Sequence, residues 1–256
     1  SGFSGGSSRA VVGEQLGALW GGLWIRDENG GLTLDDNGFP QLSNSAGVIG
    51  DPNPDYRMGL GSYLSWQGFS MNLLFDISQG GDIWNGTRGA LAFFGRAGYT
   101  AQETTLTPEQ ANDLRLYTGE TVAERYPFRQ NDDGTYTVRG TIDDFGSGDV
   151  FLDETWYRIG PGSGFTGPEE QFVEDASWAR LRELTLAYNF NRQLTNLAWL
   201  QGATLSFTGR NLFLWTDYTG NDPDTNLNGP GNNGFGLDYF QNPGTRTYKV
   251  TLTLNF

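Results

Sequence analysis

The sequence predicts an all-β fold in which antiparallel strands form part of a transmembrane β-barrel. Five segments alternate apolar and polar residues with a period of two, which gives each strand one apolar and one polar face. Each segment is about as long as a tilted strand that crosses a bilayer, which needs roughly 9–11 residues. The connections between the segments are alternately short and long, which is typical of transmembrane barrels.

The composition agrees with a turn-rich β protein. The 256 residues include 38 glycines, and aromatic residues make up 14%. Gly, Asn, Asp and Thr fill the spaces between the apolar runs, as they do in turns. No run approaches the roughly 20 apolar residues of a spanning helix. A search for such runs does not detect barrel strands, because only alternate residues of a barrel strand face lipid.

The chain contains neither Cys nor His. These absences exclude disulfides, thiolate metal sites, Cys nucleophiles and a Ser-His-Asp triad. The net charge of −14 argues against a nucleic-acid partner, because a polyanion would be repelled. The acidic run 141–154 is expected to be a solvated loop rather than the carboxylate pair of a glycosidase. We therefore predict no enzymatic activity and no catalytic residues.

The predicted strands are 56–66, 69–78, 178–190, 203–214 and 245–256. In the third strand we expect Trp178 to share the apolar face with Leu184 and Tyr188. The last strand alternates up to an aromatic residue at the end of the chain. Its apolar positions are Tyr248, Val250, Leu252, Leu254 and Phe256.

The connections assign the two sides of the membrane. A two-residue hairpin at 67–68 and the turn 191–202 are short, and with the C-terminus in the periplasm they face the periplasm. Segments 11–55, 79–177 and 215–244 are long and are predicted to be extracellular loops. In the longest loop, Thr107 to Tyr117 is the one helix-like stretch, because Thr107, Pro108 and Gln110 form the start of a capped helix.

Five strands are too few to close a barrel, since natural barrels begin at about eight. Open edges in lipid would leave backbone groups unsatisfied. The chain begins at Ser1 without a basic and apolar leader. We expect it to be a piece of a longer polypeptide that supplies the remaining strands, although a separate partner chain is an alternative.

Several motifs resemble the C-terminal end of SusC/RagA-type TonB-dependent outer-membrane transporters. The resemblance covers nearly the whole chain, and its pieces are specific only in combination. They are SWARLRELTLAYNF, LSFTGRNLFLWTDYTGNDPDTN and GLDYFQNPGTRTYKVTLTLNF, preceded by VGEQLGALWG, IGDPNPDYRMGLGSYLSWQGFSMNLLFD and QGGDIWNGTRGAL.

The resemblance implies a barrel of about 22 strands in the outer membrane of a Gram-negative cell. It also implies a plug domain and a TonB-contacting segment, both outside this chain, and a SusD-like lipoprotein that covers the pore. The cargo of such transporters is an oligosaccharide or a peptide. Membrane lipid and the barrel assembly machinery are further implied partners, and Tyr248 and Phe256 resemble the assembly signal.

Two sets of residues are candidate binding sites. Asp222, Asp224 and Asn226 have the spacing of the first ligands of a calcium loop, but its Gly and Glu are missing, so turn formation is the favoured reading. No other cofactor is expected. Five aromatic residues in or beside the predicted outer loops are candidates for stacking on a sugar or for contacting the lipoprotein, and packing at the rim is an equal alternative. They are Trp84, Trp156, Trp215, Tyr218 and Tyr239.

The alternative function is a soluble extracellular β-sheet module that binds a ligand or acts as an adhesin. Alternating strands with aromatic residues near their ends occur in soluble sandwiches as well as in membranes. The two hypotheses differ in where the apolar faces lie. They are buried within the chain in a sandwich, and exposed on it in a barrel wall.

Overall fold

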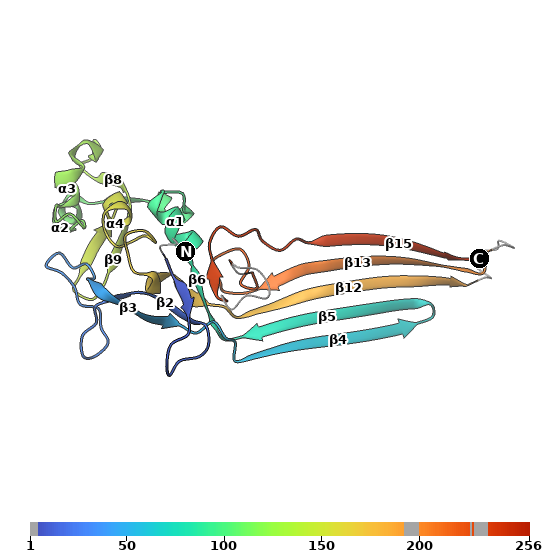
Figure 1. The fold of residues 1–256 in the computed structure, drawn as a ribbon. Helices are drawn as coiled ribbons and strands as arrows, with labels where there is room; N and C mark the ends of the chain where they lie inside the picture. The colour runs from blue at the N-terminus through green and yellow to red at the C-terminus, as the bar shows by residue number, and fades with distance from the viewer. Residues whose placement is uncertain (1–4, 192–199, 226, 228–234) are drawn as a thin grey trace. The chain divides into compact units, whose positions relative to one another are not determined.

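The computed structural model describes residues 5–191, 200–225, 227 and 235–256. The chain divides into two compact units, which are described separately (Figure 1). Unit 1 comprises Ser1–Pro52, Ile83–Glu174 and Asn226–Phe240, and unit 2 comprises Asn53–Asp82, Asp175–Thr225 and Gln241–Phe256. None of the helices in the described ranges is both long and apolar enough to cross a membrane.

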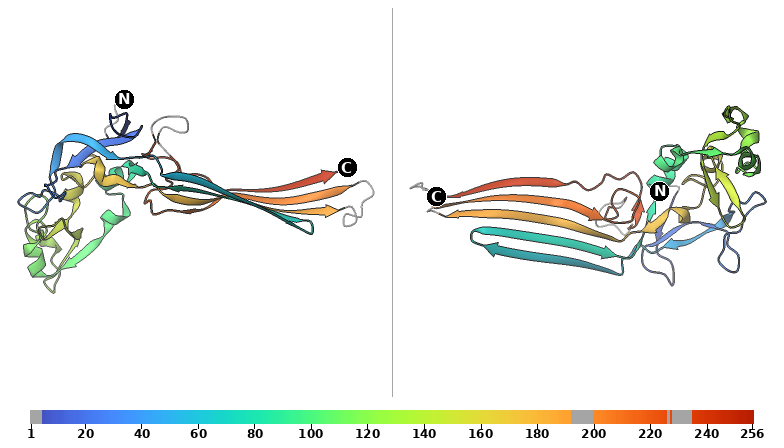
Figure 2. Two further views of the ribbon diagram at one scale, coloured as in Figure 1. Left: turned by 90° about the horizontal axis from the view of Figure 1, so that it is seen from below. Right: turned by 180° about the vertical axis from the view of Figure 1, so that it is seen from behind.

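Unit 2 is a five-stranded antiparallel sheet with the order β15-β13-β12-β5-β4 (Figure 1). Every strand lies within two residues of its predicted bounds, because the period-2 pattern is strong in all five. The strands are β4 (Tyr56–Trp66), β5 (Phe69–Gln79), β12 (Trp178–Asn191), β13 (Gly202–Trp215) and β15 (Thr247–Asn255). They twist along the sheet, as the turned views show (Figure 2).

The hairpin between β4 and β5 is the predicted two-residue turn. Gln67 and Gly68 have φ angles of 45° and 90°, and Trp66 pairs directly with Phe69. Two consecutive positive φ angles are characteristic of the type I′ turn, whose twist matches that of the flanking strands. This turn fixes the register of β4 on β5.

One face of the sheet is apolar and exposed across all five strands. Cross-strand pairs on this face include Leu60 with Phe75 and Leu205 with Leu252. Leu186 on β12 pairs with Met71 on β5 and with Phe207 on β13. Many of the side chains on this face are half-exposed or more, up to 69% for Trp66 and Val250. No other layer of unit 2 covers them among the described residues.

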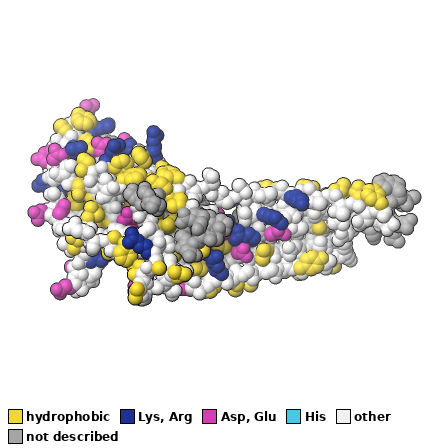
Figure 3. Space-filling view, in the orientation of Figure 1, with side chains coloured by type: hydrophobic (Ala, Val, Ile, Leu, Met, Phe, Trp, Pro, Cys, Tyr) yellow, Lys and Arg dark blue, Asp and Glu magenta, His cyan; other side chains and the backbone are white. Residues whose placement is uncertain are grey.

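The opposite face is polar, and side chains bond across its strands. The Thr185 and Thr208 hydroxyls lie 2.9 Å apart, and the Arg210 Nε donates to Glu183 at 2.9 Å. In the space-filling view, polar atoms cover most of the visible sheet, and acidic and basic side chains lie next to one another (Figure 3). Cross-strand pairs of this kind stabilise a sheet, each by roughly 0.2–1 kcal/mol.

Trp178 does not share the apolar face of its strand, contrary to the prediction. It pairs with Ser78 on the polar side, whereas Leu184 pairs with Leu73 on the apolar side. The register of β12 shifts between Leu181 and Glu183 on both of its neighbours. This β-bulge reverses the alternation, since one extra residue moves every earlier side chain to the other face.

Unit 1 contains short strands, helices and turns. β1, β2 and β3 form an antiparallel sheet, β7 pairs with β8, β9 pairs with β10, and β6 lies between β11 and β14. The strands are β1 (Ser7–Arg9), β2 (Ala18–Trp24), β3 (Leu42–Gly50), β6 (Asp82–Asn85), β7 (Glu103–Leu106), β8 (Tyr136–Arg139), β9 (Thr141–Asp144), β10 (Asp149–Leu152), β11 (Val173–Asp175) and β14 (Leu237–Asp238). The α-helices are α1 (Gly86–Phe93), α2 (Pro108–Asp113), α3 (Val122–Arg125) and α4 (Glu154–Arg158), and the 3₁₀ helices are η1 (Gly98–Ala101), η2 (Pro127–Arg129) and η3 (Glu169–Phe172).

The long segments predicted as outer loops fold around apolar cores of their own. One core surrounds Leu116 and Phe151, a second surrounds Trp84, and a third surrounds Phe39 and Trp156. Segments 11–55 and 79–177 are therefore folded structure rather than irregular chain. Their extracellular location stays a prediction.

The predicted capped helix is present as α2, but it is shorter than expected. Thr107 Oγ1 accepts from the Gln110 backbone N–H, and Gln110 bonds back to the Thr107 N–H, which completes the capping box. The helix ends at Asp113 and Leu114 is extended. The expectation of a single helix in this segment was wrong, because α1, α3 and α4 are too short to give a 3.6-residue pattern in the sequence.

Candidate functional site

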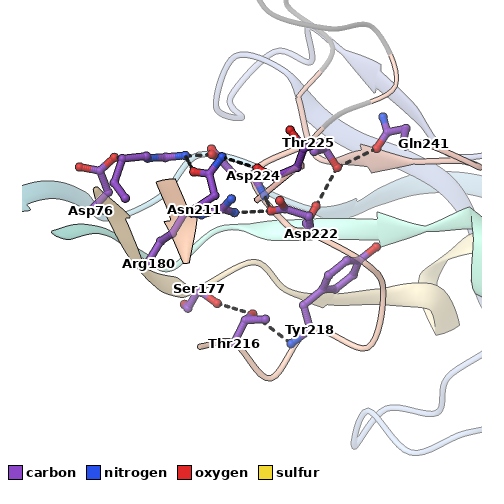
Figure 4. Close-up of polar contacts among 12 residues, drawn as sticks. Asp76, Ser177, Arg180, Asn211, Thr216, Tyr218, Asp222, Asp224, Thr225 and Gln241 are labelled. Atoms are coloured by element: carbon purple, nitrogen blue, oxygen red, sulfur yellow. Dashed lines mark hydrogen bonds and ion pairs between the residues drawn. The ribbon is translucent and has the colours of Figure 1, made fainter. Parts of the chain in front are cut away.

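A network of arginines and aspartates lies at one end of the sheet in unit 2 (Figure 4). Its most buried members are Arg180 on β12 and Asp222 in the segment after β13. Arg180 Nη2 donates to Asp222 Oδ1 at 2.5 Å, and the two side chains are 5% and 6% exposed. The Arg180 guanidinium also lies over the Trp178 ring, 5.2 Å from its centre. The pair is therefore enclosed, and its energy depends on both partners being present.

Arg182 joins three other segments. Its Nε donates to Asp76 on β5 at 2.6 Å, its Nη2 to Asp224 at 3.1 Å and its Nη1 to the Asn211 side-chain oxygen at 3.2 Å. Arg182 is the residue of the bulge on β12, so its register position pairs with neither neighbouring strand. The bulge thus leaves its side chain able to bridge between elements rather than to lie in a cross-strand row.

Asn211 lies on β13 at the same irregularity. Its φ is 52°, in the left-handed region that Asn tolerates better than most residues. Its side-chain amide donates to the Thr245 carbonyl at 3.1 Å, 34 residues away, ahead of the last strand.

The same network holds the segment Thr216–Thr225. Asp222 Oδ1 accepts from the Asp224 backbone N–H at 3.0 Å, and the Asp222 carbonyl accepts from the Thr225 hydroxyl at 2.8 Å. At the other end of the segment, Thr216 Oγ1 donates to the Ser177 carbonyl at 2.7 Å. These contacts make the first part of the predicted loop 215–244 a fixed structure.

Gly244 lies against the buried pair. A Cβ atom at this position would come 3.0 Å from Asp222 Oδ2, closer than side chains normally approach, and 3.6 Å from Arg180 Nη1. The Asn-Pro-Gly sequence before β15 therefore has a packing role beyond starting the strand. A side chain at residue 244 would push against the Asp222 carboxylate.

Both acidic calcium candidates form ion pairs with arginines in the structure and are not arranged around a cation. Asp222 is paired with Arg180 and Asp224 with Arg182, while Asn226 lies outside the described residues. In the part of the chain that the structure describes, no group of three acidic side chains comes together as a metal site. The spacing of these residues thus reflects the loop geometry and the ion pairs.

The aromatic candidates separate into buried and exposed residues. Trp84 is 1% exposed, and Trp156 and Tyr218 are also buried, so in this structure these three are core residues and do not present a surface for ligands. Tyr239 is half-buried and stacks parallel to Trp84 at 6.2 Å. Trp215 is exposed on the apolar face, where its ring lies 5.8 Å from that of Phe213. For these last two residues the predicted contact stays a prediction.

Tyr248 and Phe256, the predicted assembly signal, are both exposed in unit 2. Tyr248 lies on the apolar face of β15, and its ring stacks on that of Phe207 at 6.1 Å. Their role in assembly stays a prediction.

The network joins residues from three of the stretches that resemble one family. Arg180 and Arg182 come from the SWARLREL stretch, Asn211 from GRN, Asp222 and Asp224 from DPDT, and Gly244 from NPG. Sequence reasoning did not select the two arginines, because an arginine within an alternating strand reads as an ordinary polar-face residue. No local signal pairs them with aspartates, because Asp222, Asp224 and Asp76 lie 42 to 106 residues away in the sequence.

Comparisons with known proteins were made at the level of family, sequence and structure. No protein-family model matches the chain. Three receptors of Formosa agariphila are similar in sequence. TonB-dependent receptor P3 is 30% identical over 235 residues, which is 90% of this chain and 19% of the relative. P26 is 26% identical over 272 residues, 98% of this chain and 24% of the relative, and P39 is 24% identical over 205 residues, 80% and 16%.

Solved structures of the RagAB peptide importer are similar in fold. The open-open state gives a TM-score of 0.51 at 17% identity, covering 93% of this chain and 22% of that one. The closed-closed state gives 0.51 at 16% identity, covering 100% and 25%. The chain thus spans about a quarter or less of the length of the proteins it matches. The likeness to these structures confirms the predicted fold class, the antiparallel strands of a large transmembrane barrel. The sequence similarity shows that the chain belongs to the TonB-dependent receptor family.

Proposed function

We propose that this chain is part of the wall and outer loops of an outer-membrane transporter that imports oligosaccharides or peptides with a SusD-like lipoprotein. The observation that carries the proposal is the exposed apolar face of the five-stranded sheet. A soluble sandwich would bury such a face against a second layer. Water is a poor environment for so large an apolar surface, and lipid is a favourable one.

The two edges of the sheet support the same proposal. β4 and β15 each pair with one strand only among the described residues. Unpaired strand edges in lipid are strongly unfavourable, and closing a barrel with further strands removes them. The rest of a longer receptor would supply those strands, together with a plug and a TonB-contacting segment.

The polar face would then line the interior of the barrel, with the arginine–aspartate network at its outer end. There the network would hold the segment Thr216–Thr225 and the approach to the last strand in place. Its role in this proposal is structural: each carboxylate has a cationic or hydrogen-bonding partner, which suits positioning rather than acid–base chemistry.

The cargo and the lipoprotein partner rest on relatives and not on residues of this chain. The similar solved structures are of a peptide importer, which supports peptides as one class of cargo. A folded unit 1, with its own cores, would offer a stable surface for a lipoprotein that covers the pore.

The test uses the full receptor that contains this chain. A strain lacking the receptor should fail to grow on a large peptide or oligosaccharide that supports the parent strain, and the intact receptor should restore growth. A receptor with Leu252→Asp, on the apolar face, should be missing from the outer-membrane fraction and fail to restore growth. Thr253→Asp, on the polar face, should restore it. If instead the strain grows normally and loses only surface attachment, the adhesin alternative is correct.

A further inference from the structure

Unit 1 contains a cavity of about 480 Å³ that none of the sequence motifs indicated. It lies between α1, η1, η2, β8 and α4, so its wall combines residues from Ala92 to Arg158, which are 66 positions apart in the sequence. Its volume is within the range of roughly 300–1,000 Å³ that small-molecule sites occupy. The composition of its wall indicates what it binds.

Three arginines line this cavity: Arg129, Arg139 and Arg158. Within the described ranges, none of them forms an ion pair with a carboxylate. Arg139 is held by the Thr100 carbonyl, to which its Nε donates at 2.7 Å. In a chain with a net charge of −14, this cavity thus gathers three arginines that form no ion pair among the described residues.

Aromatic rings make up much of the remaining wall. Two of the arginines lie over such rings, Arg158 over Phe93 at 5.3 Å and Arg129 over Phe128 at 5.6 Å. Stacking of this kind orients a guanidinium while its N–H groups stay available to a ligand. Phe128 is 74% exposed, so it offers a ring face to a ligand instead of filling a core. The six rings in the wall are Phe93, Phe94, Tyr99, Tyr126, Phe128 and Tyr157.

The two carboxylates of the wall differ in their availability. Asp153 is fully buried, and its oxygens accept from the Tyr126 hydroxyl at 2.5 Å and from Thr155. It therefore fixes Tyr126 in the wall. Its ion pair is with Arg125, whose Nε lies 3.7 Å away, and among the described residues it forms none with the three arginines that line the cavity. Glu154 is exposed and forms no ion pair among the described residues, so it is available to accept hydrogen bonds from a ligand.

We propose that this cavity binds a short anionic saccharide. The carboxylate or sulfate group would lie between the arginines, which bind such groups with paired N–H donors. The C–H face of the sugar ring would pack on Phe128 and its neighbours, and Glu154 would accept from a sugar hydroxyl. An acidic peptide satisfies the arginines equally well, and its N–H groups can donate to Glu154, but its backbone does not offer the flat C–H face of a sugar ring to the exposed Phe128. The proposal concerns binding to unit 1 and does not depend on transport.

The test is calorimetric titration of the purified full receptor in detergent, without TonB or an energy source. The probes are digalacturonate, neocarrabiose 4-sulfate, neutral galactobiose and an acidic tripeptide of two glutamates and one phenylalanine. At least one of the two anionic sugars should bind at least about tenfold more tightly than galactobiose, and the difference between them identifies the acidic group. Binding of neither anionic sugar, or tighter binding of the tripeptide, would overturn the proposal.

Variants place the binding in the cavity. The double variant Arg129→Gln/Arg158→Gln changes two exposed side chains and should weaken binding of the anionic sugar by about tenfold or more, since it removes the charge-assisted hydrogen bonds to the acidic group. Phe128→Ala should weaken it as well. Arg9→Gln, an exposed arginine of unit 1 outside the cavity, is the matched control and should bind as the parent does. Unchanged affinity in the double variant would overturn the assignment.

Discussion

Arg180 and Asp222 lie 42 residues apart in the sequence and form an almost completely buried ion pair, with Nη2 and Oδ1 separated by 2.5 Å. The pair connects β12 to the segment after β13, and Gly244 lies against it. A buried pair of this kind has a characteristic response to substitution. Removal of one partner leaves an uncompensated charge, whereas replacement of both by apolar residues does not.

We expect Arg180→Met to destabilise the receptor by about 3–5 kcal/mol, because Asp222 is left buried and unpaired. Arg180→Met/Asp222→Leu should recover most of this loss. The measurement is the midpoint temperature at which the folded form disappears in a heat-modifiability gel of the full receptor. A double variant that is less stable than either single variant would contradict the account.

Asn211 provides a test of the β13 irregularity. Asn211→Gly keeps a residue that accepts the φ of 52° but removes the bonds to Arg182 and Thr245. Asn211→Ala removes the same bonds and adds backbone strain of about 1–2 kcal/mol, since left-handed φ is unfavourable for residues with a Cβ. The alanine variant should therefore melt at a lower temperature than the glycine variant. Equal midpoints would show that the backbone at residue 211 relaxes.

The sequence predicted the elements whose signal is local. The period-2 pattern located all five strands of unit 2, and Gln67–Gly68 predicted the tight hairpin. The bulge at Arg182 was not predictable, because one inserted residue within a strand changes no local propensity but reverses every side chain before it. This is why Trp178 was assigned to the wrong face.

Unit 1 was the larger omission. Its strands are two to nine residues long, and its cores combine residues from different parts of the segment 79–177, such as Leu106, Val122 and Phe151. Periodicity needs longer elements, so these segments read as loops. The network of unit 2 was missed for a related reason. Its ion pairs join Arg180 and Arg182 to residues 42 and 106 positions away.

The apolar face of β15 should be intolerant of charge. Leu252→Lys places an ammonium group beside Leu205 on that face, at an expected cost of about 2–4 kcal/mol near the middle of a bilayer. Thr253→Lys, one residue later on the polar face, should have little effect. The readout is the amount of folded receptor in the outer-membrane fraction. Equal amounts of the two variants would contradict the assignment of the faces.

Tyr157 gives unit 1 a dependence on alkaline pH. Burial is the main cause that raises the pKa of Tyr157 from 10.0 to about 12, with smaller contributions from Tyr99 and Asp143. Because the folded pKa is raised, the neutral phenol contributes stability that is fully present below pH 10 and is lost as the pH rises through about 12. The absorbance at 295 nm of the parent minus that of Tyr157→Phe should titrate near pH 12. A difference that titrates near pH 10 would show that the ring is open to water.

The central claim is that the alternate apolar side chains of the sheet face lipid. The given chain has no cysteine, so single cysteines can be introduced at successive positions 248–254 of β15 and spin-labelled in the full receptor in bilayers. The measurement is the accessibility of each label to oxygen, which dissolves in lipid, and to a water-soluble nickel chelate. The account predicts high oxygen accessibility at residues 248, 250, 252 and 254 and low accessibility at 249, 251 and 253. Labels at the even positions that are shielded from oxygen, or no alternation at all, would contradict it.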